Sequence, residues 1–434
     1  MLKSILYIGL ASVAAVIALF SPITGAIACV EAYLFNPKAI QMQDWGFRYQ
    51  LWTSVAFLAG ILIKRPKPVA KVGSEGAVVW LTWIFVLMCL LSSFWALSSP
   101  GEALDAASDM IKTMVVATAF IWAIRSEADL STFITACLVG VLHAAFLHTF
   151  GVRLGFVAAL ADRDEGVLIE GQSQVMVLFI PLLVMVLVRG SRAQRLLAFV
   201  TLPLALNSAV KSYQRTAFVA LVVEGVLLIL FLPRKIRLQT LAVLLAGGAL
   251  FYLRLAPDNY WSRMQTIKDP QSEGSAASRF VFAEVSWQMF QDHPLGVGYK
   301  NYQYVSPMYL DASYLTEGKR SSHNSFFAVL CDMGIFGFVP WMWAVALALL
   351  KLRSVRRAAD PATLRPVEAY AMGAEIGLYG WLVTGLFGDN SGLDPAYWLL
   401  VLAVIMYRLS RVRTEDATAS LEAAENIVLD PHPA

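Results

Sequence analysis

Residues 323–350 read HNSFFAVLCDMGIFGFVPWMWAVALALL. Beyond the polar start, Asp332 is the one charged side chain in this apolar run. A helix needs about 20 consecutive apolar residues to cross the hydrocarbon core of a bilayer. The stretch therefore predicts a membrane-spanning helix, with His323 at the boundary between lipid and water.

The composition of the whole chain gives the same indication. Of its 434 residues, 58% are hydrophobic and 15% are charged, whereas a soluble protein carries about 25% charged residues. The mean hydropathy is +0.62, and a net charge of +3 is too small to indicate a nucleic-acid partner. The four cysteines lie singly within apolar runs, so they form neither a zinc pattern nor a disulfide framework. These features exclude DNA-binding proteins, secreted disulfide-rich proteins and cytosolic enzymes.

The apolar runs predict an all-α polytopic membrane protein with about twelve transmembrane helices. The first run is too long for one straight helix and is interrupted at Ser21-Pro22 and Gly25, so it forms either one kinked span or a span plus a half-helix. The predicted spans are 4–34, 48–63, 78–95, 107–124, 130–150, 171–188, 194–210, 213–231, 236–253, 324–350, 368–387 and 394–408.

Short basic loops set the expected orientation, because cytoplasmic loops retain Lys and Arg. Lys and Arg are concentrated in every second loop along the chain. We place these loops in the cytoplasm, together with both termini. The opposite side holds one long loop, periplasmic if the cell is Gram-negative. The basic residues are Lys64, Arg65, Lys67, Lys71, Arg125, Arg189, Arg192, Arg195, Arg234, Lys235, Arg237, Lys351, Arg353, Arg356, Arg357, Arg365, Arg408, Arg411 and Arg413.

The long loop is the one region that could fold outside the membrane. It mixes aromatic and basic side chains, and residues 279–291 predict a short amphipathic helix within it. Loops of this length in compact proteins are usually functional or disordered, and this composition favours an amphiphilic substrate over an inert connector. The expected parts of the chain are a transmembrane bundle of about nine spans (1–253), the loop domain (254–322), C-terminal transmembrane helices (323–408) and a cytoplasmic tail (409–434). Residues 414–434 of this tail are polar and acidic, and we expect them to be flexible.

The chain holds five histidines, and His323 has the most informative position. It follows the long loop, precedes a predicted span and stands beside Asn324. An imidazole in such a place titrates near neutral pH and can act as a general base. The alternative is an interfacial histidine without a catalytic role.

Basic residues on the same predicted side indicate an anionic ligand. Arg215 lies just inside a predicted span, where a guanidinium group is costly unless it is paired or functional. Arg279 begins the predicted loop helix, and Lys319 and Arg320 shortly precede His323. Guanidinium groups present fixed donors that suit phosphate, so this region predicts a diphosphate site. The alternatives are snorkelling of Arg215 and binding of anionic lipid headgroups.

Acidic residues occur on this side as well. Asp105, Asp109 and Lys112 share one helix face, and Asp109 is the expected partner of Lys112. Asp389 and Asp394 lie in the last outer loop, where either could orient an imidazole. The outer loops have no closely spaced acidic pair, and the chain has no HExxH or Walker A motif, so we expect no metal ion and no other cofactor. The few intramembrane charges favour an enzyme over an ion-coupled transporter.

The segment that begins at His323 resembles the O-antigen ligase family, which includes protein O-oligosaccharyltransferases and is related to the O-antigen polymerases. The family's motif is His, then Asn, Ser or Gln, nine residues, Gly, two residues, and Gly, Thr or Tyr. Here it reads His323-Asn324, Gly334 and Gly337.

Two upstream segments carry the same resemblance. The stretch from Arg279 to the turn PLGVG (294–298) looks like the family's outer-loop block. QRTAFVAL (214–221) resembles the family's SRGAFLAL element, with Thr216 where Gly is common and Gln where Ser is common. The N-terminal segment YLFNPKAIQMQDWGFRY (33–49) looks like O-glycosylation ligases of exosortase-associated systems, which leaves the acceptor open.

The resemblance implies a GT-C-like glycosyltransferase in the bacterial inner membrane, with its active site facing the periplasm. Its implied donor is a glycan on undecaprenyl diphosphate, and its implied acceptor is lipid A–core of lipopolysaccharide. His323 would be the general base and Arg215 and Arg279 would bind the diphosphate. A protein O-oligosaccharyltransferase, an O-antigen polymerase and a transporter of lipid-linked glycans remain alternatives. Residues that could support the site are Asn324, Asp389, Lys319 and Arg320.

Overall fold

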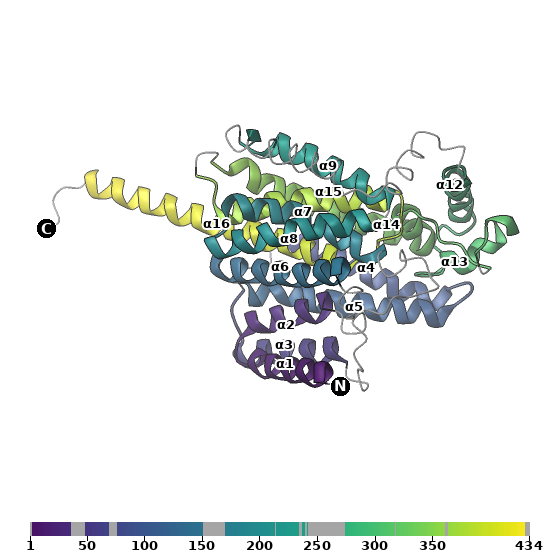
Figure 1. Cartoon of the computed structure of the whole chain (residues 1–434), viewed down its shortest axis with the longest axis horizontal. Helices are drawn as coiled ribbons and strands as arrows, with labels where there is room; N and C mark the ends of the chain where they lie inside the picture. The colour runs from purple at the N-terminus through teal and green to yellow at the C-terminus, as the bar shows by residue number, and fades with distance from the viewer. Residues whose placement is uncertain are drawn as a thin grey trace.

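The computed structural model is helical throughout the residues that it describes (Figure 1). These residues are 2–35, 48–68, 76–150, 170–212, 214–233, 237–238, 241, 274–316, 318–360 and 363–429. No strand occurs in these ranges, where the one β-type pairing is an isolated bridge between Thr316 and Lys319.

Fourteen α-helices and three short 3₁₀-helices make up this structure. The 3₁₀-helices are η3 (Ser93–Trp95), η6 (Ser306–Met308) and η7 (Ala312–Tyr314). The α-helices are α1 (Leu2–Ala18), α2 (Pro22–Leu34), α3 (Tyr49–Lys64), α4 (Ala77–Ser92), α5 (Pro100–Ala123), α6 (Glu127–Phe150), α7 (Glu170–Arg189), α8 (Arg192–Lys211), α9 (Arg215–Phe231), α12 (Gly274–Asp292), α13 (Tyr302–Val305), α14 (Ser325–Ala358), α15 (Pro366–Gly385) and α16 (Asp394–Leu429).

Five of the described helices are long and apolar enough to cross a membrane. They are Ala77–Trp95, Pro100–Ala123, Glu127–Phe150, Arg192–Val210 and Ser325–Ala358. Shorter apolar helices lie in α1, α2, α3 and α7. An all-helical, polytopic membrane protein is therefore confirmed, whereas twelve crossings and the GT-C-like class stay predictions.

Three comparisons between the helix boundaries and the predicted spans are informative. The first run is broken as expected, because Ser21 is extended (φ −135°) and Pro22 opens α2 at the position that tolerates a missing N–H. The predicted start of the 107–124 span was wrong, since α5 begins at Pro100. The tail, which the sequence predicts to be flexible from residue 414, is helical as far as Leu429, because α16 continues to that residue. Most of the predicted span 236–253 lies outside the described residues.

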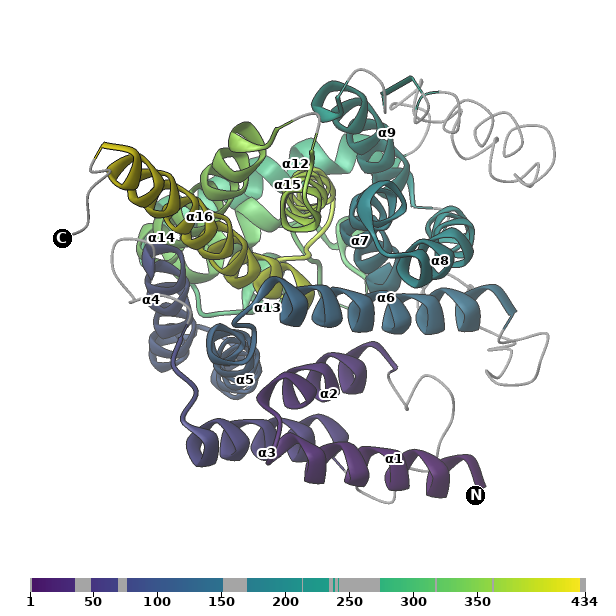
Figure 2. The ribbon, with the colours of Figure 1, turned by 90° about the vertical axis from the view of Figure 1, so that its left-hand side faces the viewer.

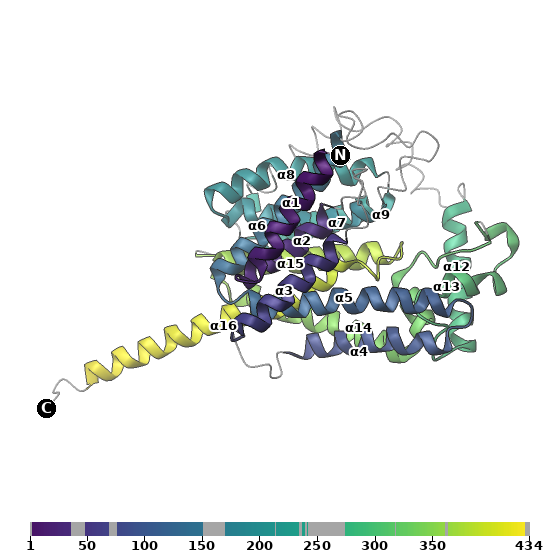
Figure 3. The ribbon, with the colours of Figure 1, turned by 90° about the horizontal axis from the view of Figure 1, so that it is seen from below.

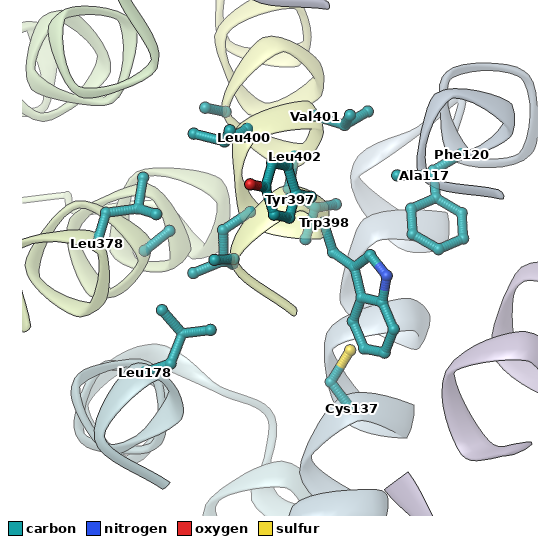
Figure 4. Packing of buried hydrophobic residues seen from close by; sticks show 14 of the residues in the cluster. Ala117, Phe120, Cys137, Leu178, Leu378, Tyr397, Trp398, Leu400, Val401 and Leu402 are labelled. Atoms are coloured by element: carbon teal, nitrogen blue, oxygen red, sulfur yellow. The ribbon is translucent and has the colours of Figure 1, made fainter. Parts of the chain in front are cut away.

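α15 is the central helix of the bundle (Figure 2). Nearly all of its side chains are buried, and it packs against α7, α9, α14 and α16. α1, α2 and α3 lie together on one side of α6. Figure 4 shows the core where Trp398 of α16 approaches Phe120 of α5 and Cys137 of α6. All four cysteines are free and buried, as the sequence predicted.

The bundle has two distinct ends (Figures 1 and 3). We call one of them the α12 end, because α12 and α13 lie there, beyond the bundle. The helices α9, α14 and α16 begin at this end. At the end that we call the tail end, α14 finishes at Ala358, α15 begins at Pro366, and α16 extends away from the bundle. All of the predicted site residues belong to the α12 end.

Candidate functional site

A break in α14 shapes the α12 end. Gly334 has a left-handed backbone (φ 62°) within the helix, and a Cβ there would lie 2.2 Å from the carbonyl oxygen of Pro294. That carbonyl instead accepts a hydrogen bond from the Ile335 N–H (3.4 Å), and the Val297 N–H donates to the Cys331 carbonyl (2.8 Å). The glycine of the sequence motif is therefore required because α14 opens to receive the PLGVG turn.

The carboxylate of Asp332 fixes the chain that follows this turn. Its two oxygens accept hydrogen bonds from the backbone N–H groups of Lys300 and Tyr302, both at 2.8 Å. Its backbone carbonyl accepts from Gly298 at 2.8 Å, and a Cβ on Gly296 would lie 2.4 Å from the same oxygen. The single charge within the apolar run thus holds the loop against α14, a role that the sequence alone did not reveal.

His323 lies at the start of α14 in a left-handed conformation (φ 48°), which is uncommon for a residue with a Cβ and often marks functional sites. The next residue, Asn324, caps the helix, since its Oδ1 accepts from the N–H groups of Phe326 (2.9 Å) and Phe327 (3.1 Å). Its Nδ2 donates to the Leu386 carbonyl (3.1 Å). The contacts of Asn324 therefore position His323 relative to the end of α15.

Two arginines from distant parts of the sequence act on each other, and one of them, Arg279, also acts on His323. Arg279 lies on α12 and Arg215 begins α9. Burial, together with the positive charge of Arg215, lowers the pKa of Arg279. The Arg279 guanidinium group lies 5.4 Å from the ring centre of Phe387, and none of the ion pairs among the described residues involves Arg279. No carboxylate among the described residues therefore neutralises the charge of Arg279.

Of the two basic residues that precede His323, only Arg320 approaches it. The Arg320 guanidinium group lies 4.9 Å from the ring centre of Phe282, and the imidazole of His323 stacks on the same ring at 6.0 Å. Lys319 is exposed, and its ammonium group lies 4.2 Å from the ring centre of Tyr304. The sequence had given no reason to select Phe282 or to separate the two cations.

The surroundings of His323 favour its neutral form. Burial lowers the pKa of this imidazole, the positive charges of Arg320 and Arg279 lower it further, and the negative charge of Asp389 raises it in part. A neutral imidazole keeps a free nitrogen lone pair near pH 7, as a proton acceptor requires.

Asp389 pairs with a cation rather than with the imidazole. One of its oxygens lies 2.8 Å from Lys300 Nζ, and the other accepts from the Ser391 hydroxyl at 2.7 Å. Burial raises the pKa of Asp389, but the charge and hydrogen bond of Lys300 and the hydrogen bonds from Ser391 together outweigh that effect, and the net pKa is lowered. This ion pair links the PLGVG turn to the loop between α15 and α16.

The remaining acidic residues lie at the α12 end of α5 and α16. Asp109 pairs with Lys112 at 2.8 Å, as the sequence predicted, and both side chains are exposed. Asp394 begins α16. Among the residues that the structure describes, no three His, Cys, Asp or Glu side chains gather as a metal site would require.

The family comparison bears on this end of the bundle. Residues 200–342 match the family model for O-antigen ligase. The chain is similar to this family over that segment. The matched segment contains Arg215, Arg279 and His323 together with the PLGVG turn and the broken helix, so the resemblance noted in the sequence is confirmed. The match supports a ligase-type or polymerase-type function in O-antigen processing. No match to the chain was found among curated proteins.

Proposed function

We propose that this protein transfers a preassembled glycan from undecaprenyl diphosphate to a hydroxyl of lipid A–core, as an O-antigen ligase. The observation that supports this proposal most strongly is the set of cations around His323. Arg279 has no carboxylate partner among the described residues and lies close enough to Arg215 for that charge to lower its pKa. Its own charge is one of those that lower the pKa of His323. A diphosphate would supply the missing negative charge.

In this proposal, His323 accepts the proton of the acceptor hydroxyl. The acceptor oxygen attacks C1 of the first sugar, the bond from C1 to the diphosphate oxygen breaks, and its electron pair leaves with undecaprenyl diphosphate. Arg215 and Arg279 stabilise the negative charge that grows on the leaving diphosphate. A single displacement of this kind inverts the configuration at C1, and the two guanidinium groups take over the charge neutralisation that a divalent cation performs in other enzymes.

The membrane setting follows from the same assignment. We place the α12 end at the periplasmic face of the inner membrane and both termini in the cytoplasm, because short basic loops stay in the cytoplasm. The donor's lipid chain would then lie between helices, below the loop domain 254–322. A reporter fused after Lys300 should report the periplasm and one after Arg357 the cytoplasm. Reversal of either signal would move the site to the wrong side for this substrate.

Two other acceptors fit the same donor site. A protein O-oligosaccharyltransferase would use a Ser or Thr hydroxyl, and an O-antigen polymerase would use a second lipid-linked glycan. Deletion of the gene separates these possibilities. Loss of a ligase should leave core-only lipopolysaccharide while the lipid-linked polymer accumulates. Normal lipopolysaccharide in the deletion strain would contradict the ligase assignment.

A transporter of lipid-linked glycans would move the same donor without a chemical step. Purified protein, donor and acceptor distinguish it from an enzyme, because only an enzyme forms the new linkage. We expect product in excess EDTA, with C1 inverted, and loss of most activity in Arg279→Lys and Arg215→Lys, since an ammonium group cannot reproduce the bidentate guanidinium contact. Strict dependence on added metal, retention at C1 or full activity of both Lys variants would contradict the mechanism.

A further inference from the structure

Arg320 is held in place by three separate contacts. Its backbone carbonyl accepts a hydrogen bond from the Ser306 hydroxyl (2.9 Å), and its Nη1 donates to Thr316 Oγ1 (3.0 Å). Its guanidinium group lies against Phe282, 4.9 Å from the ring centre. These contacts fix Arg320 three residues before His323, whose imidazole also rests on Phe282.

One donor of this guanidinium group has no partner among the residues that the structure describes. The Nε–H of Arg320 is buried and makes no hydrogen bond within the described residues. Buried donors are nearly always satisfied in native proteins, because an unmade hydrogen bond costs the desolvation of that group. A buried N–H of a charged group, fixed beside the base, therefore has the properties of a donor that a bound ligand completes.

The ring of Phe282 gives this arrangement its rigidity. Its side chain is 1% exposed, and it contacts Tyr314 edge-on with ring centres 6.2 Å apart. Because the ring cannot move away, a shift of Arg320 would disturb the imidazole of His323 as well. The charge of Arg320 and the position of the base are thus coupled through one side chain.

We propose that Arg320 is a positioning residue that acts on His323 through Phe282 and that its Nε–H binds an oxygen atom of the substrate. This inference rests on the proposed glycosyl transfer and extends it with a third arginine that the family resemblance does not assign. The bound oxygen belongs either to the acceptor sugar or to the donor diphosphate. In both cases the cation that receives the substrate also keeps the base in its neutral form.

The charges that face His323 come from three parts of the structure. Arg320 precedes it in the loop, Arg279 faces it from α12, and Asp389 acts from the loop after α15 while pairing with Lys300. Removing the charge of Arg320 leaves one cation and the opposing carboxylate. The protonated imidazole is then less disfavoured, so the pKa of His323 must rise in Arg320→Gln.

The first test measures that rise directly. Imidazole signals of His323 are followed by NMR titration in wild-type protein and in Arg320→Gln, and the acid limb of kcat/KM is measured in parallel. Both should move to higher pH by about one unit, which is the scale of one nearby charge at a protein surface. Lys319→Gln is the matched control, because it removes the neighbouring exposed charge and should leave both values in place. An unchanged pKa of His323 in Arg320→Gln would overturn the inference.

The second test uses Arg320→Lys, which keeps the positive charge but removes the Nε–H. The acid limb should stay near the wild-type position, while KM rises about 10-fold for one substrate because a hydrogen bond to a charged group is lost. A rise in KM for the acceptor assigns the oxygen to the acceptor sugar, and a rise for the donor assigns it to the diphosphate. If Arg320→Lys has wild-type KM values for both substrates, the Nε–H of Arg320 does not bind substrate. This test does not depend on whether Arg320→Gln folds.

Failure of this inference differs from failure of the proposed function. If His323→Ala retains full activity, the general-base mechanism is wrong and Arg320 has no base to position. If His323→Ala is inactive but the substitutions at Arg320 change neither the pKa of His323 nor either KM, only the role of Arg320 is wrong.

Discussion

The two ends of the helical bundle differ in whether their arginines are paired with carboxylates. At the tail end, Arg356 makes two hydrogen bonds to the fully buried carboxylate of Glu375, from Nε at 2.6 Å and from Nη2 at 3.0 Å. Arg365 contacts Glu368 at 2.7 Å and Glu127 at 3.5 Å. At the α12 end, Arg279 has no such partner among the described residues.

This difference separates structural charges from charges that are available to a ligand. A buried cation is costly unless a carboxylate or another anion neutralises it. The ion pair of Arg356 and Glu375 joins α14 to α15, and each charge in it is already neutralised by the other. Near His323, burial and the charge of Arg215 lower the pKa of Arg279, and burial and the charges of Arg320 and Arg279 lower the pKa of His323. Such an arrangement of cations costs stability until an anion binds.

The α12 end contains one internal control for this comparison. Lys300 and Asp389 form a 2.8 Å ion pair in which both side chains are partly buried. The fold can therefore supply a carboxylate to a cation at this end. Within the described ranges, the lack of a carboxylate on Arg279 is then a specific feature of the site rather than a general property of the loops.

The largest effect is expected at the proposed base. His323→Ala should lower the rate of glycan transfer by ~10²–10⁴-fold, the usual contribution of a positioned general base, without loss of the folded protein. His293→Ala is the matched control, because this second histidine at the α12 end makes its hydrogen bonds through the backbone. The rate of transfer is measured with purified protein in both variants. If His323→Ala keeps near-wild-type turnover, His323 has a structural role and is not the general base.

The next effect concerns stability at the tail end. Glu375→Ala leaves Arg356 without its buried partner and should lower the free energy of unfolding by ~3–5 kcal/mol, with unchanged activity per folded molecule. Asp109→Ala removes one partner of an exposed pair and should cost at most about 1 kcal/mol. Denaturant titration of both variants measures the difference. Equal costs would contradict the structural role assigned to the tail-end pair.

A smaller effect is expected where the PLGVG turn meets the break in α14. Gly334→Ala places a Cβ 2.2 Å from the Pro294 carbonyl at a positive φ, which should cost ~1–3 kcal/mol of stability and reduce transfer by displacing the PLGVG turn. Gly101→Ala is the control, since nothing lies within 4 Å of a Cβ there. Thermal unfolding and transfer rate are measured together. A Gly334→Ala variant with wild-type stability would show that α14 does not need its break.

Much of the fold could be predicted from the sequence because each apolar run carries its own signal. The span expected at 130–150 is α6 (Glu127–Phe150), and the span expected at 368–387 is α15 (Pro366–Gly385). The span expected at 107–124 starts later than α5, which begins at Pro100, because charged side chains lower the hydropathy of the first turns of this helix. The shared helix face expected for Asp105, Asp109 and Lys112 already required a helix that begins before residue 107. Hydropathy reports contact with lipid, and it underestimates helices that extend beyond the membrane.

The site was predictable only in part because its contacts join distant residues. A histidine before an apolar run and an arginine at a helix start are visible locally. The role of Asn324 as a helix cap could also have been predicted, since Asn is favoured at that position. The partners of Gly334 and Lys300 could not, because Pro294 and Asp389 lie 40 and 89 residues away. Neither partner leaves a periodic signal in the sequence.

Binding of undecaprenyl diphosphate to the purified protein in nanodiscs tests the central comparison most directly. The account predicts that Arg279→Gln weakens binding about 10-fold or more, because a hydrogen-bonded charge contact is lost, while its thermal stability stays near that of the wild type. Arg356→Gln should show the reverse, with lower stability and an unchanged Kd for the folded fraction. Wild-type affinity in Arg279→Gln, or weakened binding in folded Arg356→Gln, would contradict the assignment of the α12 end as the diphosphate site.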